Sequence, residues 1–498
     1  MVSATRRPTD DGSVAAALRS PRRLRTEVLG GLVVALALIP EAISFSIIAG
    51  VDPRVGLFAS FTMAVTIAIV GGRRAMMSAA TGAVALVIAP VMAQHGLDYL
   101  IATVILAGVL QIVLSMIGVA RLLRFIPRSV MVGFVNALSI LVFLAQIPHL
   151  IGVPWLVYPM VAIGLVIVAF LPKLTTAVPA PLVAIVLLTS ATIVFSLDVP
   201  NVGDEGELPS SLPTPLLPDV PFTLDTLKII APYALAVALV GLLESLMTAK
   251  LVDDITDTHS DKTREGWGQG VANIVTGFFG GMGGCAMIGQ TMINVKSSGA
   301  RTRISTFLAG VFLLILVVGL GDVVALIPMA ALVAVMIMVS VGTMDWHSIA
   351  PKTLRRMPIA ETIVMLVTVA VTVATHNLAY GVITGVLSAM VAFAHRVAHF
   401  TAVDQVAESD DTRTYMVRGE LFFASSNDLV YQFDYAGDPA NIVIDMSDAH
   451  IWDASTVATL DAITTKYAAK GKNVRIVGLN PASEARHDRL SGHLAGGH

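Results

Sequence analysis

Cysteine and charge are both scarce in this chain. Its 498 residues include one cysteine, Cys285, and only 13% are Asp, Glu, Lys or Arg. A single cysteine excludes a disulfide framework and a Cys-rich metal site. Charged residues make up about a quarter of ordinary soluble proteins, so the low fraction here argues against a soluble fold. The 55% of hydrophobic residues and the mean hydropathy of +0.79 indicate a membrane protein instead.

The absence of other sequence features excludes further classes of function. No acid–base or metal cluster is apparent, so we expect neither an enzyme nor a cofactor. The few charges inside the apolar runs argue against the continuous polar lining of a channel. Residues 1–25 are polar and Arg-rich and lead straight into a long apolar run, a pattern unlike that of a cleavable signal peptide. We expect no nucleic-acid partner.

Long apolar runs are what the chain has in abundance. Runs of about 17 to 25 residues, the length that crosses a bilayer as a helix, recur roughly fourteen times between Thr26 and Ala398. We therefore predict a polytopic α-helical domain at residues 26–398 in the lipid bilayer of the cell membrane, preceded by a short segment at residues 1–25.

Lysine and arginine predict the orientation of this domain. Basic residues follow every second predicted span, whereas the opposite loops, such as the acidic Pro-rich stretch at 198–221, are almost free of them. By the positive-inside rule, the N-terminal segment and everything after Ala398 are expected on the cytoplasmic side. This arrangement requires an even number of spans.

The chain changes character at about Ala402. Thr414–Phe423, Asn441–Met446 and Asn473–Gly478 have strand patterns, and Ala454–Ala469 has a helix pattern. Alternating strands and helices predict a small cytoplasmic α/β domain at residues 402–498.

Two glycine-broken segments interrupt the apolar runs. The longer, Gly280–Arg303, reads GGMGGCAMIGQTMINVKSSGARTR, and a shorter one, SAATGA, begins at Ser78. Irregular backbone at membrane depth is tolerated only where protein or a wet cavity surrounds it, and secondary transporters use paired half-helices of this kind to bind anions. Each segment follows an acidic residue in an earlier span at a similar sequence separation: Glu41 precedes the SAATGA segment, and Glu244 precedes Gly280–Arg303. Seven spans lie on each side of the acidic loop, which predicts a 7+7 inverted repeat.

These residues resemble the sulfate permease family of anion transporters. PEAISFSIIAGVDPRVGLFAS, GLLESLMTAKLVDDIT, GQGVANIVTGFFGGMGG and TMINVKSSGARTR are similar to its conserved stretches, and IVIDMSDAHIWDASTVATLD resembles the STAS domain that follows the membrane region. The resemblance implies a core and a gate domain, frequent dimers, and elevator-type transport of anions such as sulfate, bicarbonate, chloride or oxalate.

The candidate substrate site lies at the starts of the two half-helices. Free N–H groups and the positive dipole end favour anions there, so the backbone around Thr81 and Ala286 is the expected donor. The substrate-binding candidates are Glu41, Phe45, Thr81, Gly82, Ser245, Cys285, Ala286 and Met287. Two of them have plainer alternatives: Phe45 as an apolar wall and Cys285 as a packing residue. In the second broken segment, Gly281, Gly283 and Gly284 could instead serve only to allow tight helix packing.

Glu244 and Thr248 are the candidates for a coupling ion. An ionisable residue about midway along a span is costly and functional by default, although Glu244 could also be a structural acid. Thr248 shares the helical face of Glu244, but its hydroxyl could bond back to its own helix. The resemblance implies a further threonine for sodium binding where this chain has Ile288. We therefore favour proton symport over sodium symport. Glu41 stands where the family usually has glutamine, and its role stays open.

The function predicted from the sequence is secondary active transport of an inorganic oxyanion of the sulfate or bicarbonate class, coupled to protons. A sodium-coupled bicarbonate symporter, a dicarboxylate carrier, and an exchanger or channel of the same family remain alternatives. A nucleobase carrier shares the fold but lacks the STAS pattern. We expect a homodimer. In the tail, Asp453 and Ser455 lie where regulatory STAS proteins are phosphorylated or bind partners, but Asp453 would also serve as a helix cap. We expect a role in folding or assembly first, and regulation by a cytoplasmic partner second.

Overall fold

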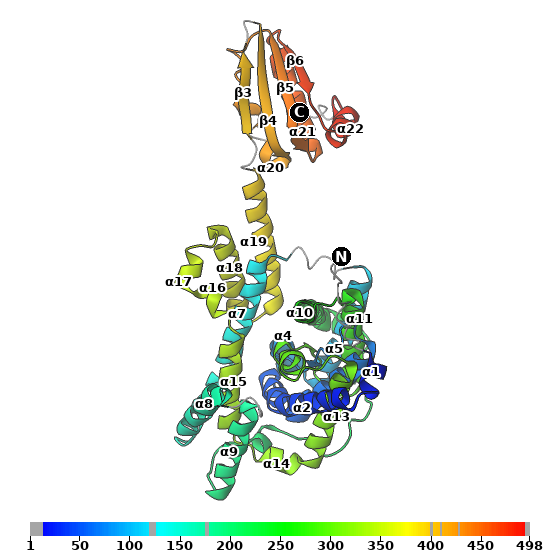
Figure 1. Cartoon of the computed structure of the whole chain (residues 1–498), viewed down its shortest axis with the longest axis vertical. Helices are drawn as coiled ribbons and strands as arrows, with labels where there is room; N and C mark the ends of the chain where they lie inside the picture. Colours follow the sequence, from blue (N-terminus) through cyan, green and yellow to red (C-terminus); the bar gives the residue numbers. More distant parts are fainter. Residues whose placement is uncertain are drawn as a thin grey trace, which may run out of the picture. The chain divides into compact units, whose positions relative to one another are not determined.

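The computed structural model describes residues 13–118, 126–174, 179–398, 402–408, 411–426 and 429–493. The chain divides into two compact units, Met1–Val386 and Leu387–His498 (Figure 1). The first unit holds the membrane helices up to the first part of α19 (Leu378–Ala398), and the second holds the rest of α19 and a mixed sheet with its helices.

The membrane helices form two sets of seven segments among the described residues. The first set is α2 (Pro21–Ala49), α3 (Pro53–Val70), α4 (Gly82–His95), α5 (Leu97–Met116), α7 (Arg128–Leu144), α8 (Val157–Leu174) and α9 (Ala180–Val194). The second set is α10 (Leu224–Thr256), α11 (Lys262–Phe278), α12 (Ile288–Met292), α13 (Arg303–Gly319), α15 (Met329–Thr343), α18 (Ile359–Thr375) and α19 (Leu378–Ala398).

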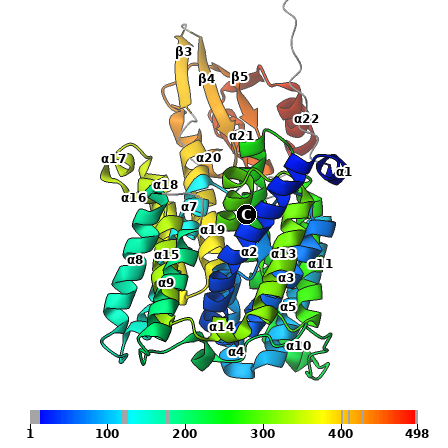
Figure 2. The same cartoon turned by 60° about the horizontal axis from the view of Figure 1, so that its bottom comes forward.

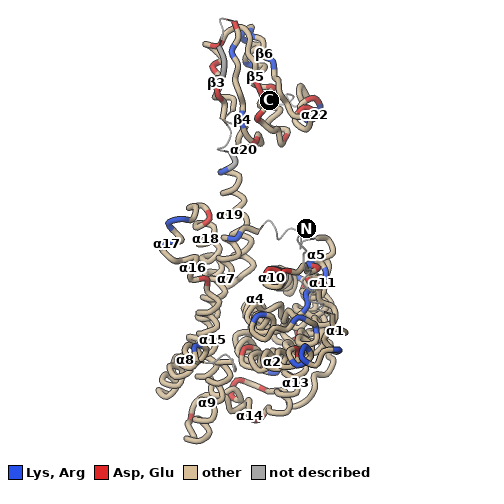
Figure 3. Tube along the Cα trace, in the orientation of Figure 1, with Lys and Arg blue, Asp and Glu red and all other residues tan. Residues whose placement is uncertain are grey.

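Length and composition identify these helices as membrane segments. Seven of them in the described ranges are long and apolar enough to cross a bilayer, and five more are apolar and only slightly shorter. Figure 3 shows the membrane helices as long stretches without charged residues. The protein is therefore a multi-pass membrane protein, as the apolar runs predicted.

The two sets of helices repeat one pattern. Each begins with a long helix that contains a proline, Pro40 in α2 and Pro232 in α10, and continues with a shorter helix. A two-residue strand then precedes a half-helix: β1 (Ser78–Ala79) before α4, and β2 (Cys285–Ala286) before α12. The two strands pair antiparallel, so the equivalent segments of the two sets run in opposite directions. This is the arrangement that an inverted repeat requires.

The helices also sort into two groups by their contacts. A core group, α2–α5 with α10–α13, is held by the packing of α11 on α5 and of α13 on α2 and α3. A gate group contains α7, α8, α9, α15 and α18, in which α7 packs on α18 and α8 on α15. The start of α19 joins the gate group, because Gly381 lies against Thr372 of α18. In Figure 2, α8, α9 and α15 stand together on the left, and α3, α5 and α13 on the right.

The loop that leads into β1 is anchored to the second set of helices. Glu265, at the start of α11, accepts hydrogen bonds of 2.8 Å from the backbone N–H groups of Gly72 and Arg73. Arg73 also forms a 2.9 Å ion pair with Asp253 near the end of α10. Both carboxylates are largely shielded from water, so these charge-assisted bonds fix the entry to the strand pair.

The second unit contains a four-stranded sheet. Its strands are β3 (Ala402–Glu408), β4 (Thr412–Leu421), β5 (Asn441–Ile451) and β6 (Asn473–Val477), in that order across the sheet. β3 and β4 are antiparallel, whereas β4, β5 and β6 are parallel to their neighbours. The helix α21 (Ala454–Ala468) packs Leu460 and Ile463 into the core, and α22 (Pro481–Leu490) follows β6. The α/β pattern predicted from the sequence is confirmed, with β3 as an additional strand.

Asp453 caps α21, as we expected from its position. Its carboxylate accepts bonds of 3.0 Å from both the backbone N–H and the hydroxyl of Thr456, and a further bond from the N–H of Phe423. The cap therefore also ties α21 to the segment after β4.

Small residues let α5 and α11 approach closely. A methyl group added at Gly270 would lie 2.5 Å from the carbonyl oxygen of Gly108, and one added at Gly108 would lie 2.5 Å from that of Gly270. Small residues at such crossings are typical of membrane helix packing.

We predict that Gly270→Leu lowers the stability of the protein, because the added side chain must separate α5 from α11. Overpacking of this kind costs about 1–3 kcal/mol. The measurement is the thermal unfolding midpoint of the detergent-purified protein. The control is Gly342→Leu in α15, where an added methyl group meets no atom within 4 Å. Equal midpoints for the two variants would contradict this packing argument.

Candidate functional site

The candidate site is built where the two broken segments meet. β1 and β2 pair through Ser78 with Ala286 and Ala79 with Cys285, and a half-helix begins directly after each strand. The first turns of α4 and α12 therefore start from the same strand pair. This is the head-to-head arrangement predicted from the sequence repeat.

The two half-helices begin differently. Thr81 is the N-cap of α4, and its hydroxyl oxygen accepts a 3.3 Å bond from the N–H of Val84. Met287 is the N-cap of α12 and supplies no such side-chain bond. The spacing of the sequence repeat had matched Thr81 with Ala286, but the helix starts match Thr81 with Met287. α12 then continues as a π-helix, η4 (Ile293–Ser297), an irregularity frequent at functional sites.

Glycine makes the close pairing of the strands possible. Gly284 precedes β2, and a side chain on it would collide with the carbonyl oxygen of Ala79. Gly283 has φ +76°, a left-handed conformation that glycine adopts without strain. At α4, a methyl group added to Gly82 would lie 2.9 Å from the ring of Phe45, so Phe45 of α2 packs directly against the first residue of that helix.

Polar side chains of α11 satisfy the irregular backbone. The amide of Asn273 donates a 3.0 Å bond to the carbonyl of Gly284 and accepts a 2.9 Å bond from its N–H. Gln269 donates a 2.7 Å bond to the hydroxyl of Ser78 in β1. Both amides are fully buried. They replace the water that the strand pair would need outside the membrane.

Sequence reasoning missed these two amides, although the sequence contains a signal for them. Glu265, Gln269 and Asn273 recur every four residues along α11, and Thr276 follows three residues later. Residues at this spacing share one helical face. A polar face on a membrane helix points to a polar partner inside the protein, and here that partner is the strand pair.

Cys285 joins the candidate ion site to the candidate anion site. Its thiol donates a 2.9 Å bond to the carboxylate of Glu244, and its sulfur lies 3.1 Å from the hydroxyl oxygen of Thr81. Glu244 is 8% exposed, and the other two residues are buried completely or nearly so. One side chain therefore contacts both the acid of α10 and the cap of α4.

The neighbours of Glu244 on α10 have separate partners. The hydroxyl of Ser245 accepts a 3.1 Å bond from the N–H of Ala286, which fixes β2 to α10. Thr248 is buried and donates a 2.8 Å bond to the carbonyl of Glu244. This is the bond back to its own helix that we considered from the sequence, and it leaves the oxygen lone pairs of Thr248 as its only means of binding an ion.

Glu41 lies beside the other half-helix. Its carboxylate lies next to the side chain of Gln290 in α12. The acid of the first set of helices thus contacts the half-helix of the second set, whereas the acid of the second set, Glu244, reaches the cap of α4 through Cys285. This exchange of partners follows from the inverted repeat.

Gly289, in the first turn of α12, borders open space. It is exposed, and a methyl group added to it would meet no atom within 4 Å. The contrast with Gly82, which Phe45 covers, shows that the α12 side of the strand pair is accessible. No sequence pattern indicates this difference, because both glycines lie in similar broken segments.

Comparisons with known proteins agree with this architecture. The sulfate permease family model matches residues 24–161 and 153–368, and the STAS domain model matches residues 405–492. A Bacillus subtilis (strain 168) protein named "Putative sulfate transporter YbaR" is 54% identical over 462 residues, which cover 93% of this chain and 96% of that protein.

Two solved structures share the fold. The murine anion transporter Solute Carrier 26 family member A9, in its inward-facing state, superposes with a TM-score of 0.79 at 16% identity, covering 98% of this chain and 92% of that one. The transmembrane domain of the cyanobacterial bicarbonate transporter BicA superposes with a TM-score of 0.64 at 26% identity, covering 72% and 98%. The family resemblance and the helical transporter fold with a C-terminal STAS domain are confirmed.

We predict that Asn273→Leu disrupts the strand pair, because the N–H and carbonyl of Gly284 lose their partner in a buried position. Each unpaired group costs about 1–3 kcal/mol. The thermal unfolding midpoint should fall well below that of a control, Gln146→Leu, which removes another buried amide whose hydrogen bond goes to the carbonyl of Val142, four residues earlier in the chain. If both variants unfold at the same temperature, Asn273 does not hold the strand pair.

Proposed function

Because the chain belongs to the sulfate permease family, whose members are membrane anion transporters, we propose that it is a secondary active transporter of small inorganic oxyanions. The sulfate or bicarbonate class fits best, since its relatives include proteins named as transporters of these two anions. The antiparallel pairing of β1 with β2 is the observation that carries this proposal, because it brings the starts of two half-helices together.

The anion would bind at these helix starts. Backbone N–H groups at the first turn of a helix, together with the positive end of its dipole, favour a negative charge. Thr81 and Gly82 supply this backbone at α4 in the proposal. At α12, the N–H of Ala286 donates to Ser245 and that of Met287 donates to the carbonyl of Met77, so Ala286 and Met287 position the helix start and the N–H groups of the first turn, from Ile288 on, are the proposed donors. Phe45 forms an apolar wall against α4, and the open space beside Gly289 admits the anion on the α12 side.

Glu244 would carry the coupled cation. A buried carboxylate is costly unless a cation or a proton neutralises it, and among the described residues the thiol of Cys285 donates a hydrogen bond to it. Since Cys285 also contacts the N-cap of α4, neutralising Glu244 would change the charge next to the anion site. This contact gives a short physical route for coupling, and it explains why Cys285 belongs to the proposed site.

We favour a proton over sodium as the coupled ion. Sodium prefers several oxygen ligands, whereas Thr248 is engaged with its own helix and Ile288 offers no hydroxyl. A proton needs only the carboxylate. Sodium-coupled bicarbonate transport is the second candidate, because Glu244 and Thr248 lie one turn apart on α10 and a structural relative is named as a bicarbonate transporter. Uptake into vesicles under separate proton and sodium gradients distinguishes the two.

The remaining features of the proposal concern movement and orientation. The core group would move against the gate group in an elevator cycle, and two copies of the chain would form a dimer. The distribution of lysine and arginine supports cytoplasmic placement of both residues 1–25 and the STAS domain at 402–498. In the sequence these two segments flank the transmembrane domain at 26–398. The STAS domain would serve assembly and could receive a cytoplasmic partner.

We predict that Glu244→Gln abolishes concentrative anion uptake, because the amide can no longer take up a proton or hold a cation. The variant keeps a hydrogen-bonding side chain of equal size, so the protein should remain folded and still bind anion. The measurement is accumulation of radiolabelled sulfate or bicarbonate in vesicles with an imposed gradient. Glu361→Gln in the first turn of α18 is the control and should accumulate anion normally. Normal accumulation by Glu244→Gln would remove this residue from the coupling mechanism.

We predict that Gly289→Trp blocks anion binding while preserving stability. The indole would occupy the open space at the first turn of α12 without colliding with neighbouring atoms. Anion affinity of the purified protein and its unfolding midpoint should be measured together. Gly342→Trp, which also enters open space but lies in α15, should keep wild-type affinity. A stable Gly289→Trp variant with unchanged affinity would place the anion site elsewhere.

A further inference from the structure

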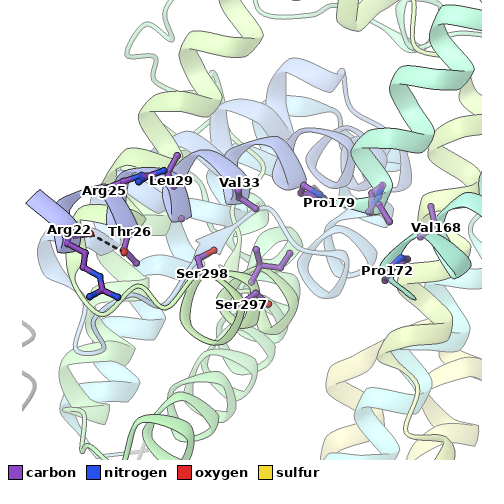
Figure 4. Close-up of a pocket in the computed structure, with 14 residues that line it drawn as sticks. Arg22, Arg25, Thr26, Leu29, Val33, Val168, Pro172, Pro179, Ser297 and Ser298 are labelled. Atoms are coloured by element: carbon purple, nitrogen blue, oxygen red, sulfur yellow. Dashed lines mark hydrogen bonds between the residues drawn. The ribbon is translucent and has the colours of Figure 1, made fainter. Parts of the chain in front are cut away.

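A furrow with one basic end runs along α2. Its upper part, at the N-terminal end of α2, is a cavity of about 650 Å³. The first half of α2, the π-helix η4 and the facing parts of α8 and α9 line this cavity. Figure 4 shows Arg22, Thr26 and Leu29 of α2 together with Ser297 and Ser298, and Val168 and Pro172 of α8 across the opening. Arg22 and Arg25 supply two positive charges, and none of the fourteen lining residues is acidic.

The lower part of the furrow is apolar. A second cavity of about 250 Å³ lies between α2, α9 and residues 316–327, and its lining includes Leu36, Ile39, Leu182, Ile185 and Val186. Arg22, Thr26, Leu29, Val33 and Leu36 follow one another at intervals of three or four residues, so a single face of α2 lines both cavities. The two cavities are therefore parts of one surface.

This surface faces outward rather than into a water-filled route. Leu29 is 47% exposed at the basic end, and Val186 and Ile193 are 53% and 51% exposed in the lower part. An anion pathway needs polar groups along its length, whereas the lower furrow offers only Thr189 and Ser190 among apolar side chains. At membrane depth, exposed apolar side chains of this kind contact acyl chains.

We propose that the furrow binds an anionic phospholipid, with the phosphate between Arg22 and Arg25 and an acyl chain along α2 and α9. Neither guanidinium has a hydrogen-bond or ion-pair partner in the part of the chain that the structure describes, and the hydroxyls of Ser297 and Ser298 are additional donors beside them. Arginine is suited to phosphate because its planar fork can bind two oxygens at once.

The dimensions of the furrow fit one leaflet. Arg25 and Leu36 are eleven positions apart in the sequence, which corresponds to roughly 16 Å along a helix. Half of the hydrocarbon core of a bilayer is about 15 Å thick. A lipid with its phosphate at Arg25 therefore reaches the lower cavity with its acyl chain. Because α2 belongs to the core group and α8 and α9 to the gate group, the bound lipid lies between two groups of helices.

The test is lipid binding to the purified full-length protein, measured by native mass spectrometry. Phosphatidylglycerol should bind more tightly than phosphatidylcholine with the same acyl chains. The double variant Arg22→Ala, Arg25→Ala should lose this preference and weaken phosphatidylglycerol binding by roughly thirtyfold. Arg355→Ala, Arg356→Ala is the matched control, since it removes two exposed arginines outside the furrow and should leave binding unchanged.

A second pair of variants tests the apolar half without changing charge. Val186→Trp fills the lower furrow, whereas Leu187→Trp adds the same bulk at a neighbouring position that is equally exposed, at 53%, but does not line it. Only Val186→Trp should weaken phosphatidylglycerol binding, and both should keep the wild-type unfolding midpoint.

Three outcomes overturn the proposal. Equal binding of the two phospholipids to the wild-type protein is one, and unchanged phosphatidylglycerol binding in the Arg22, Arg25 variant is another. The third is binding of glycerol phosphate, which has no acyl chains, as tightly as phosphatidylglycerol, because it would identify a site for free anions. None of these outcomes depends on transport, so they leave the proposed transport function to its own tests.

Discussion

The whole membrane unit depends on one constraint, which is that two breaks in helical backbone must be satisfied inside a bilayer. Some of the backbone groups at the two breaks satisfy one another, since β1 and β2 form hydrogen bonds as an antiparallel pair. Buried side chains from three helices bind the backbone groups that the pair leaves without a partner: Asn273 of α11, Ser60 of α3 and Ser245 of α10. Gln269 of α11 adds a bond to the side-chain hydroxyl of Ser78 in β1. Polar residues that look out of place in apolar helices are thus required by the breaks.

Helix packing supplies the geometry that these bonds need. The glycine contact between α5 and α11 brings a polar helix face close to the strand pair, and Glu265 and Arg73 fix the loop that enters β1. Once the strands are in place, the chemistry of the proposed site follows from proximity. Cys285 sits in β2, and from there it reaches both Glu244 and Thr81.

The division into core and gate groups gives the second level of organisation. The strand pair and both acids lie within the core group, so the proposed ion and anion sites can move as one body. The furrow along α2 lies where α2 meets α8 and α9, and its basic and apolar parts follow one helix face. A lipid held there contacts both groups, which would make the surrounding membrane part of the surface over which the groups move.

Features that depend on local pattern could be predicted from the amino-acid sequence alone. Apolar runs identified the membrane segments, strand and helix patterns identified the α/β tail, and glycine-broken segments after Glu41 and Glu244 located the two half-helices. Which residues meet depends on the folded arrangement of the helices. The contact of Cys285 with Thr81, 204 positions apart, the match of Thr81 with Met287 and the open space at Gly289 have no local signature. The spacing of polar residues along α11 indicates that Asn273 has a polar partner, but not that this partner is Gly284. The physical reason is that periodicity reports which face of a helix is apolar, whereas contacts between distant segments depend on how closely helices pack and where the backbone bends.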